Sequence, residues 1–130
     1  MTTAALSDTQ ICIAALAARR TAAHLEAVAR PALRPFGITV TDYQMLVALV
    51  ELPERTCRAG ELAPRMAVTS GGVTKALDRA VLRGLVTRRP SPDDGRGQQV
   101  TLTPYGADQL AAAVPVLAAA FRSHLDAVQG

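Results

Sequence analysis

Apolar residues recur at helical spacing along much of this chain. The first such stretch, Ile11–Arg30, has small and branched apolar residues on one face and ends before Pro31. The second begins at Thr41 and ends at Pro53. Its opening, Thr41-Asp-Tyr-Gln44, has the form of a capping box, in which Gln44 hydrogen-bonds back to the Thr41 backbone. We expect this second helix to bury four apolar residues: Tyr43, Leu46, Val47 and Val50.

A short helix and a longer one follow in the middle of the chain. The short helix is expected around Gly60–Met66. The longer one starts at Thr69 or Ser70, both favourable N-cap residues, and runs to Arg83. Gly84 then closes it, because glycine adopts the left-handed backbone that ends many helices. Its predicted inner face consists of four apolar residues at helical spacing: Val73, Ala76, Leu77 and Ala80.

The pattern then changes to that of a β-hairpin and returns to a helix. Leu85–Arg89 and Gln99–Leu102 are typical of strands, and Pro90–Gly97 between them is rich in turn residues. Thr103 as N-cap and Pro104 in the first turn open the last helix. That helix has a continuous apolar stripe: Leu110, Val114, Leu117, Phe121, Leu125 and Val128. A stripe of this length must pack on the first helix or on a second subunit.

Composition and charge narrow the class of protein. Apolar residues make up 49% of the chain, but with two Phe, two Tyr and no Trp the core must be Ala, Leu and Val, which favours packed helices. The net charge is only +3, yet nine basic and four acidic residues lie between Arg55 and Arg96, which indicates a local polyanion-binding surface. The cysteines, Cys12 and Cys57, form neither a metal motif nor a disulfide framework.

The start of the chain and its uncharged segments bear on its compartment. The N-terminus lacks the basic region of a signal peptide. The longest uncharged run, Gln109–Phe121, is too short to span a bilayer. We therefore expect a cytoplasmic protein with no membrane partner. The pattern contains no arrangement of nucleophile and base, paired carboxylates or phosphate-binding loop, so we expect no enzymatic activity, no cofactor and no metal.

The order of the predicted elements carries the functional information. A helix, a short helix, a tight turn, a basic helix and a hairpin with a basic tip form a winged helix-turn-helix. A helix fits the major groove of B-DNA, and a hairpin can reach the backbone or minor groove beside it. The predicted fold class is therefore mainly α with a small β-hairpin, and the predicted partner is double-stranded DNA.

Several motifs in this order resemble the MarR family of multidrug and stress regulators over roughly residues 36–125. They are Leu62-Ala63, Val68-Thr-Ser-Gly-Gly-Val-Thr-Lys-Ala-Leu-Asp-Arg79, Arg83-Gly-Leu-Val-Thr-Arg-Arg-Pro90, Pro92-Asp-Asp-Gly-Arg-Gly97 and Leu102-Thr-Pro-Tyr-Gly106. The resemblance implies a single domain over residues 1–130, with a winged-helix core at about 40–103. It also implies dimerisation helices at about 8–35 and 104–128, and therefore a homodimer on a palindromic operator.

The resemblance further implies which residues meet DNA. In the wing, Asp94 orients Arg96, and Arg96 enters the minor groove. The other residues that it places at DNA are Thr69, Ser70, Gly71, Thr74, Lys75, Arg79 and Arg88. Gly95 stands where relatives often carry a second Arg, so we expect one phosphate contact fewer. The chain ends near Gly130 without the further C-terminal helix common in relatives, so we expect a reduced or differently built dimer interface.

Three functions remain open at this stage. The leading one is a transcriptional regulator, in the family's manner a repressor, whose DNA affinity responds to a small aromatic or phenolic effector bound between the dimerisation helices and the winged core. The second is a thiol-based redox regulator using Cys12, because Gln10-Ile-Cys-Ile resembles the peroxide-sensing segment of one branch of the family. Leu16 and Asp42, however, stand at two positions where that branch has tyrosines. The third is a winged-helix protein-interaction module.

Overall fold

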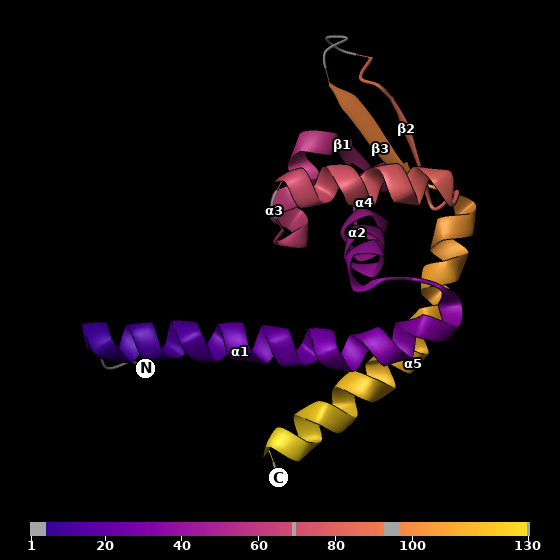
Figure 1. The fold of residues 1–130 in the computed structure, drawn as a ribbon. Helices are drawn as coiled ribbons and strands as arrows, with labels where there is room; N and C mark the ends of the chain where they lie inside the picture. The colour runs from indigo at the N-terminus through magenta and orange to yellow at the C-terminus, as the bar shows by residue number, and fades with distance from the viewer. Residues whose placement is uncertain (1–4, 69, 93–96, 130) are drawn as a thin grey trace.

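The computed structural model describes residues 5–68, 70–92 and 97–129, and these form a mainly helical fold with a small antiparallel sheet, as predicted (Figure 1). The helices are α1 (Asp8–Leu33), α2 (Val40–Val50), α3 (Leu62–Met66), α4 (Ser70–Leu82) and α5 (Pro104–Gln129). The strands are β1 (Thr56–Arg58), β2 (Val86–Pro90) and β3 (Gln98–Leu102). Short 3-10 turns precede α2, β1 and α3: η1 (Arg34–Phe36), η2 (Pro53–Arg55) and η3 (Ala59–Glu61).

The first helix is longer than the sequence predicted. A capping box starts α1: the Ser7 hydroxyl accepts from the Gln10 amide at 3.2 Å, and the Gln10 side chain accepts from the Ser7 amide at 2.8 Å. The predicted end before Pro31 is wrong, because α1 continues to Leu33. Pro31 lies in the last turn with its ring exposed, and its neighbours Ala29 and Leu33 are fully buried. Their packing holds the last turn despite the missing backbone hydrogen bond.

The second helix is capped two residues earlier than predicted. Thr39, not Thr41, is the N-cap: its hydroxyl accepts from the Asp42 amide, and the Asp42 carboxylate accepts from the Thr39 amide, both at 3.0 Å. The predicted buried face of this helix is only partly right. Leu46 is buried as expected and Tyr43 and Val50 are half-buried, but Val47 is exposed. The other buried residues of α2 are Asp42, Met45 and Leu49.

The described strands form one sheet in the order β1-β3-β2, with both pairings antiparallel. The hairpin β2–β3 was predicted, and its register aligns Arg88 with Val100. Strand β1 was not predicted, because three residues are too few to show alternation. Its extended conformation is held by pairing with β3: Cys57 lies opposite Val100, and the Thr56 hydroxyl donates to the Val100 carbonyl at 3.0 Å.

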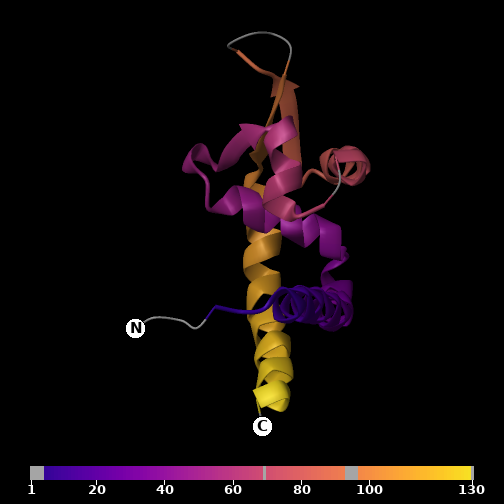
Figure 2. The same ribbon diagram turned by 90° about the vertical axis from the view of Figure 1, so that its left-hand side faces the viewer.

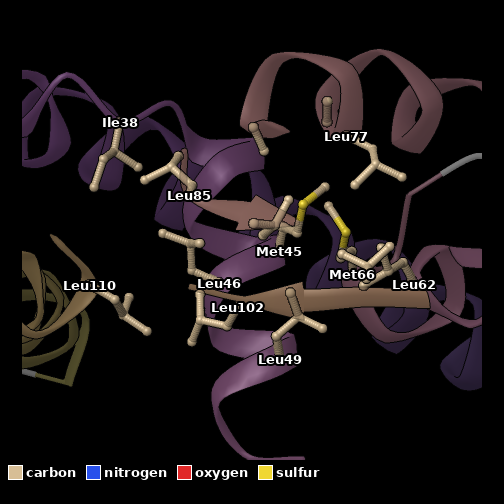
Figure 3. Packing of buried hydrophobic residues seen from close by; sticks show 14 of the residues in the cluster. Ile38, Met45, Leu46, Leu49, Leu62, Met66, Leu77, Leu85, Leu102 and Leu110 are labelled. Atoms are coloured by element: carbon tan, nitrogen blue, oxygen red, sulfur yellow. The ribbon is translucent and has the colours of Figure 1, made fainter. Parts of the chain in front are cut away.

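The core gathers around α2. In Figure 3, Met45 of this helix lies toward Leu77 of α4 and Met66 of α3, whereas Leu46 lies on the side of Leu110 of α5. The predicted inner face of α4 is confirmed, since all four residues are buried: Val73, Ala76, Leu77 and Ala80. The core therefore fixes the back of α4 and leaves its other face to solvent. The predicted winged helix-turn-helix fold is confirmed.

Helix α5 begins against the end of the α4–β2 connection. Thr103 is its N-cap as predicted, since its hydroxyl accepts from the Gly106 amide at 2.9 Å. The same hydroxyl donates to the Gly84 carbonyl at 2.6 Å and lies 3.0 Å from the Leu85 carbonyl, which also accepts from the Thr103 amide at 3.1 Å. A Cβ on Gly106 would collide with that Leu85 carbonyl oxygen. This position therefore admits only glycine without movement of the backbone.

Helices α1 and α5 cross below the winged core, and the first half of α1 runs away from the crossing (Figures 1 and 2). At the crossing, the rings of His24 and His124 stack edge to face with their centroids 6.0 Å apart. Only part of the predicted stripe of α5 is buried within this chain. Leu110 and Leu117 are buried, whereas others of the stripe, such as Val114 and Leu125, are exposed.

Length and mean hydropathy would let one described helix cross a membrane: Pro104–Ala127 of α5, with a mean hydropathy of 1.2 in its most apolar window. This segment is longer than the uncharged run Gln109–Phe121 because it includes Asp108, Arg122 and Asp126. This is weak evidence for a membrane span, because a helix that packs on other helices in a soluble protein has the same composition.

Candidate nucleic-acid interface

The exposed face of α4 carries most of the residues that the resemblance placed at DNA. Gly71, Thr74, Lys75 and Arg79 are exposed, and Ser70 is the first residue of the helix. Thr69 lies outside the described residues. Lys75 makes no ion pair with any described residue, so its ammonium group is available for a ligand.

Tight turns at both ends fix the direction of α4. Before it, Ala67 takes a left-handed backbone with φ of 57°, and the Val68 amide donates to the Ala63 carbonyl at 3.2 Å. After it, Gly84 has φ of 73°, and the Leu85 amide donates to the Ala80 carbonyl at 3.0 Å. The predicted closure at Gly84 is confirmed. The chain thus enters β2 directly from α4, which places the hairpin beside the helix.

An ion pair joins the hairpin to α4. The Arg88 guanidinium on β2 donates to the Asp78 carboxylate on α4 at 2.7 Å. At the neck of the wing, the Ser91 amide donates to the Gly97 carbonyl at 2.8 Å. Figure 1 shows the hairpin rising past α4 on the side away from α1. Asp94 and Arg96, which the resemblance placed at the wing tip, lie outside the described residues.

A buried carboxylate holds the other end of α4. Asp42 has a side chain with no exposed surface. Arg79 donates to its Oδ1 through Nε at 3.3 Å and through Nη2 at 3.2 Å, and Arg83 donates to its Oδ2 at 3.1 Å. Sequence reasoning missed this role of Asp42. The available signal was the spacing Thr39-x-x-Asp42, which satisfies the capping rule as well as Thr41-x-x-Gln44 does.

Two clefts adjoin these elements. The larger, of about 470 Å³, lies between α1 and the N-terminus of α2. It is lined by Glu26, Arg30, Arg34, Gly37, Ile38, Thr39, Val40, Thr41, Gln44 and Val68. The smaller, of about 250 Å³, brings Thr74 of α4 and Arg88 of β2 to one site.

The thiols differ in their surroundings. Cys12 is exposed on α1, and Cys57 is buried on β1. Burial raises the pKa of the Cys57 thiol, and the nearby Glu61 carboxylate raises it further, against a smaller lowering by Arg65. Cys57 is therefore protonated at neutral pH and unreactive.

The helix-turn-helix over α3 and α4, followed by a hairpin beside an exposed helix, defines a winged helix-turn-helix protein. The sequence profile of the MarR family matches residues 36–97. The multiple antibiotic resistance protein MarR of Salmonella typhimurium is 38% identical over 80 residues, or 58% of this chain. This chain spans about half of that protein's length, 51%.

Solved structures extend the similarity over nearly the whole chain. AbsC, a MarR family transcriptional regulator from Streptomyces coelicolor, is 28% identical with a TM-score of 0.78, over 97% of this chain and 84% of AbsC. Sco3205, from the same organism and solved in complex with DNA, is 30% identical with a TM-score of 0.76, over 93% of this chain and 76% of Sco3205. The chain belongs to the MarR family of transcriptional regulators.

Proposed function

We propose that this chain binds duplex DNA with sequence specificity and represses transcription by occupying its operator. The observation that carries the proposal is the exposed face of α4, with Lys75 free for a ligand, fixed beside a β-hairpin by the Asp78–Arg88 ion pair. A helix and a hairpin in this relation fit a major groove and the adjacent backbone. The proposed contacts are the residues that the resemblance implies apart from Arg79, whose guanidinium donates to the Asp42 carboxylate: Thr69, Ser70, Gly71, Thr74, Lys75, Arg88, Asp94 and Arg96.

The binding unit in this proposal is a homodimer formed by α1 and α5. Its support is the set of large apolar side chains left exposed on these two helices and beside the start of α1: Leu6, Ile11, Ile13, Leu16, Val114, Val116 and Leu125. A second copy of the same surface would cover them, and a two-fold axis would present two α4 helices to one side of DNA. The operator is then an imperfect palindrome with half-sites about 10 base pairs apart.

Selection from random duplex DNA tests this proposal. The protein is expected to enrich a palindromic site, and the logarithm of its affinity should fall steeply and linearly with the logarithm of salt concentration. The alternative, a winged-helix protein-interaction module, predicts no enriched sequence and little dependence on salt. Lack of enrichment by a protein that is dimeric and folded would contradict sequence-specific binding.

We further propose that the larger cleft binds a small aromatic or phenolic anion that modulates DNA affinity. Arg30 and Arg34 offer cationic groups, and Ile38 and Val68 offer apolar surface for a ring. The cleft also opens on the N-terminus of α2, where backbone amides favour an anion. Its volume of about 470 Å³ falls in the range of small-molecule sites.

A pair of probes that differ only in charge tests the effector site. 4-Hydroxybenzoate should bind and raise the melting temperature, and its uncharged analogue 4-hydroxybenzamide should not, because only the carboxylate pairs with arginine. Arg30→Gln should weaken binding of the anion. Equal binding of both probes, or binding of 4-hydroxybenzoate that Arg30→Gln leaves unchanged, would exclude this cleft as an anion site.

A further inference from the structure

The carboxylate of Asp42 is the meeting point of α2 and α4. Its Oδ2 accepts from the Thr39 amide at 3.0 Å and from Arg83 at 3.1 Å, and its Oδ1 accepts twice from Arg79. Arg79 also donates to the Thr39 hydroxyl at 3.3 Å. Among the described residues, this buried carboxylate thus accepts only from the cap of α2, from Arg79 of α4 and from Arg83, the residue directly after α4.

The space around Arg83 is matched to this arrangement. A Cβ on Gly37 would lie 3.1 Å from the Arg83 guanidinium, and Gly37 itself has φ of +65°. Glycine therefore both makes the turn before α2 and leaves room for the guanidinium. The paired arginines retain 43% and 36% of their side-chain exposure, but their polar ends are committed to Asp42.

Charge-assisted hydrogen bonds in a fixed fork impose a direction as well as an attraction. Apolar packing would hold α4 against α2, but it would leave the helix free to rotate or slide slightly. Two guanidinium groups on one carboxylate restrict both movements. The same pairing occupies the charges of Arg79 on α4 and of Arg83 just after it, so Lys75 is the cation on this helix that has no carboxylate partner among the described residues.

We propose that Asp42 is a positioning residue for DNA recognition, which fixes α4 in the orientation that reads a specific site and keeps Arg79 and Arg83 from acting as general phosphate contacts. This inference rests on the proposed DNA binding. It assigns Arg79 an indirect role, in place of the direct contact that the resemblance implies. It follows that a change at Asp42 should lower the preference for the selected site without lowering the affinity for DNA in general.

Asp42→Asn tests the inference, because asparagine keeps the size of the side chain and an oxygen for the Thr39 amide but loses the charge. Two duplexes are used: the site that the wild-type protein selects from random DNA, and a scrambled duplex of equal length and composition. The ratio of the two affinities should fall by about tenfold, the equivalent of losing one good base contact. Binding to the scrambled duplex should tighten, and its salt slope should steepen by up to about two, because two arginines become available for phosphates.

Two further variants separate positioning from stability. Arg79→Lys keeps the charge but cannot make the two-pronged contact with Oδ1, so it should also lower the affinity ratio. Thr56→Val removes the hydrogen bonds of the Thr56 hydroxyl to Val100 and Thr101 of β3, which involve neither Asp42 nor its arginines, and should lower the melting temperature while keeping the ratio. All variants are compared well below their melting temperatures.

The possible results have distinct meanings. A wild-type protein that selects no sequence overturns the proposed function and this inference with it. A wild-type protein that selects a site, with an Asp42→Asn variant that keeps the affinity ratio, overturns the inference alone. A ratio that falls equally in Thr56→Val also overturns it, because loss of stability would then explain the effect. An affinity ratio that falls in Asp42→Asn and in Arg79→Lys, but not in Thr56→Val, supports the inference.

Discussion

Replacement of Gly106 by alanine tests the packing that joins α5 to the winged core. The new Cβ would collide with the Leu85 carbonyl oxygen and would lie 2.9 Å from a methyl group of Leu102. The collision is with backbone, which cannot rotate away as a side chain can. The start of α5 must therefore move, and the hydrogen bonds of Thr103 to the Gly84 and Leu85 carbonyls must lengthen.

The size of the effect follows from these contacts. Overpacking of this kind costs about 1–3 kcal/mol, and each weakened hydrogen bond loses up to about 1 kcal/mol. Alanine regains at most about 1 kcal/mol over glycine in a helix. We expect a net loss of about 2–3 kcal/mol, which lowers the melting temperature by roughly 10 °C for a chain of this length.

The assay is thermal and urea unfolding, followed by circular dichroism at one fixed protein concentration because a dimer's stability depends on concentration. Gly60→Ala is the matched control, since a Cβ there would have nothing within 4 Å. It should leave stability unchanged or slightly raised. A Gly106→Ala variant as stable as Gly60→Ala would contradict the close approach of α5 to the Leu85 carbonyl.

Three further predictions concern DNA binding, assembly and pH. Lys75→Ala should cost about 1–3 kcal/mol on the selected site and relax its preference at one base pair, as measured by fluorescence anisotropy on single-base variants; an equal loss on every duplex would contradict base readout. Ile13→Glu should give monomers in light scattering, because Ile13 is 63% exposed in one chain and a dimer would bury the charge; an unchanged dimer would place the interface elsewhere. Because burial raises the pKa of Cys57, the folded chain holds this proton more tightly than the unfolded chain does. The protonated Cys57 thiol therefore makes its full contribution to stability below the thiol's pKa in the unfolded chain, which is about 8.5, and this contribution is lost as the pH rises further. Between pH 7.5 and 9.5, the free energy of unfolding measured in urea should fall more for the wild type than for Cys57→Val. Equal falls for the two proteins would contradict this pH dependence.

Features set by neighbouring residues were predictable from the sequence. The inner face of α4, its closure at Gly84 and the cap of α5 at Thr103 each depend on spacings of a few residues. The cap of α2 was placed wrongly because two overlapping segments satisfy the same rule. Thr39 and Asp42 are selected by arginines about 40 residues further along the chain, which no local pattern contains.

Features that depend on distant partners could not be predicted in this way. Strand β1 is too short to show a pattern and exists because β3 pairs with it. The apolar stripe of α5 predicted packing on the first helix or on a second subunit, but its pattern could not show that Leu117 lies in the core of this chain whereas Leu125 is exposed. Of the candidate site, the sequence predicted the exposed helix α4 and the hairpin that follows it, but it could not show that Asp42 holds Arg79.

Titration of the selected duplex with the protein, followed by native mass spectrometry and anisotropy, measures both the number of chains bound and the preference for the selected sequence. We expect two chains on each duplex and an affinity for that duplex at least about a thousandfold higher than for its scrambled counterpart at physiological salt. One chain on each duplex would contradict the dimeric mode of binding. Equal affinity for the two duplexes would contradict sequence-specific recognition.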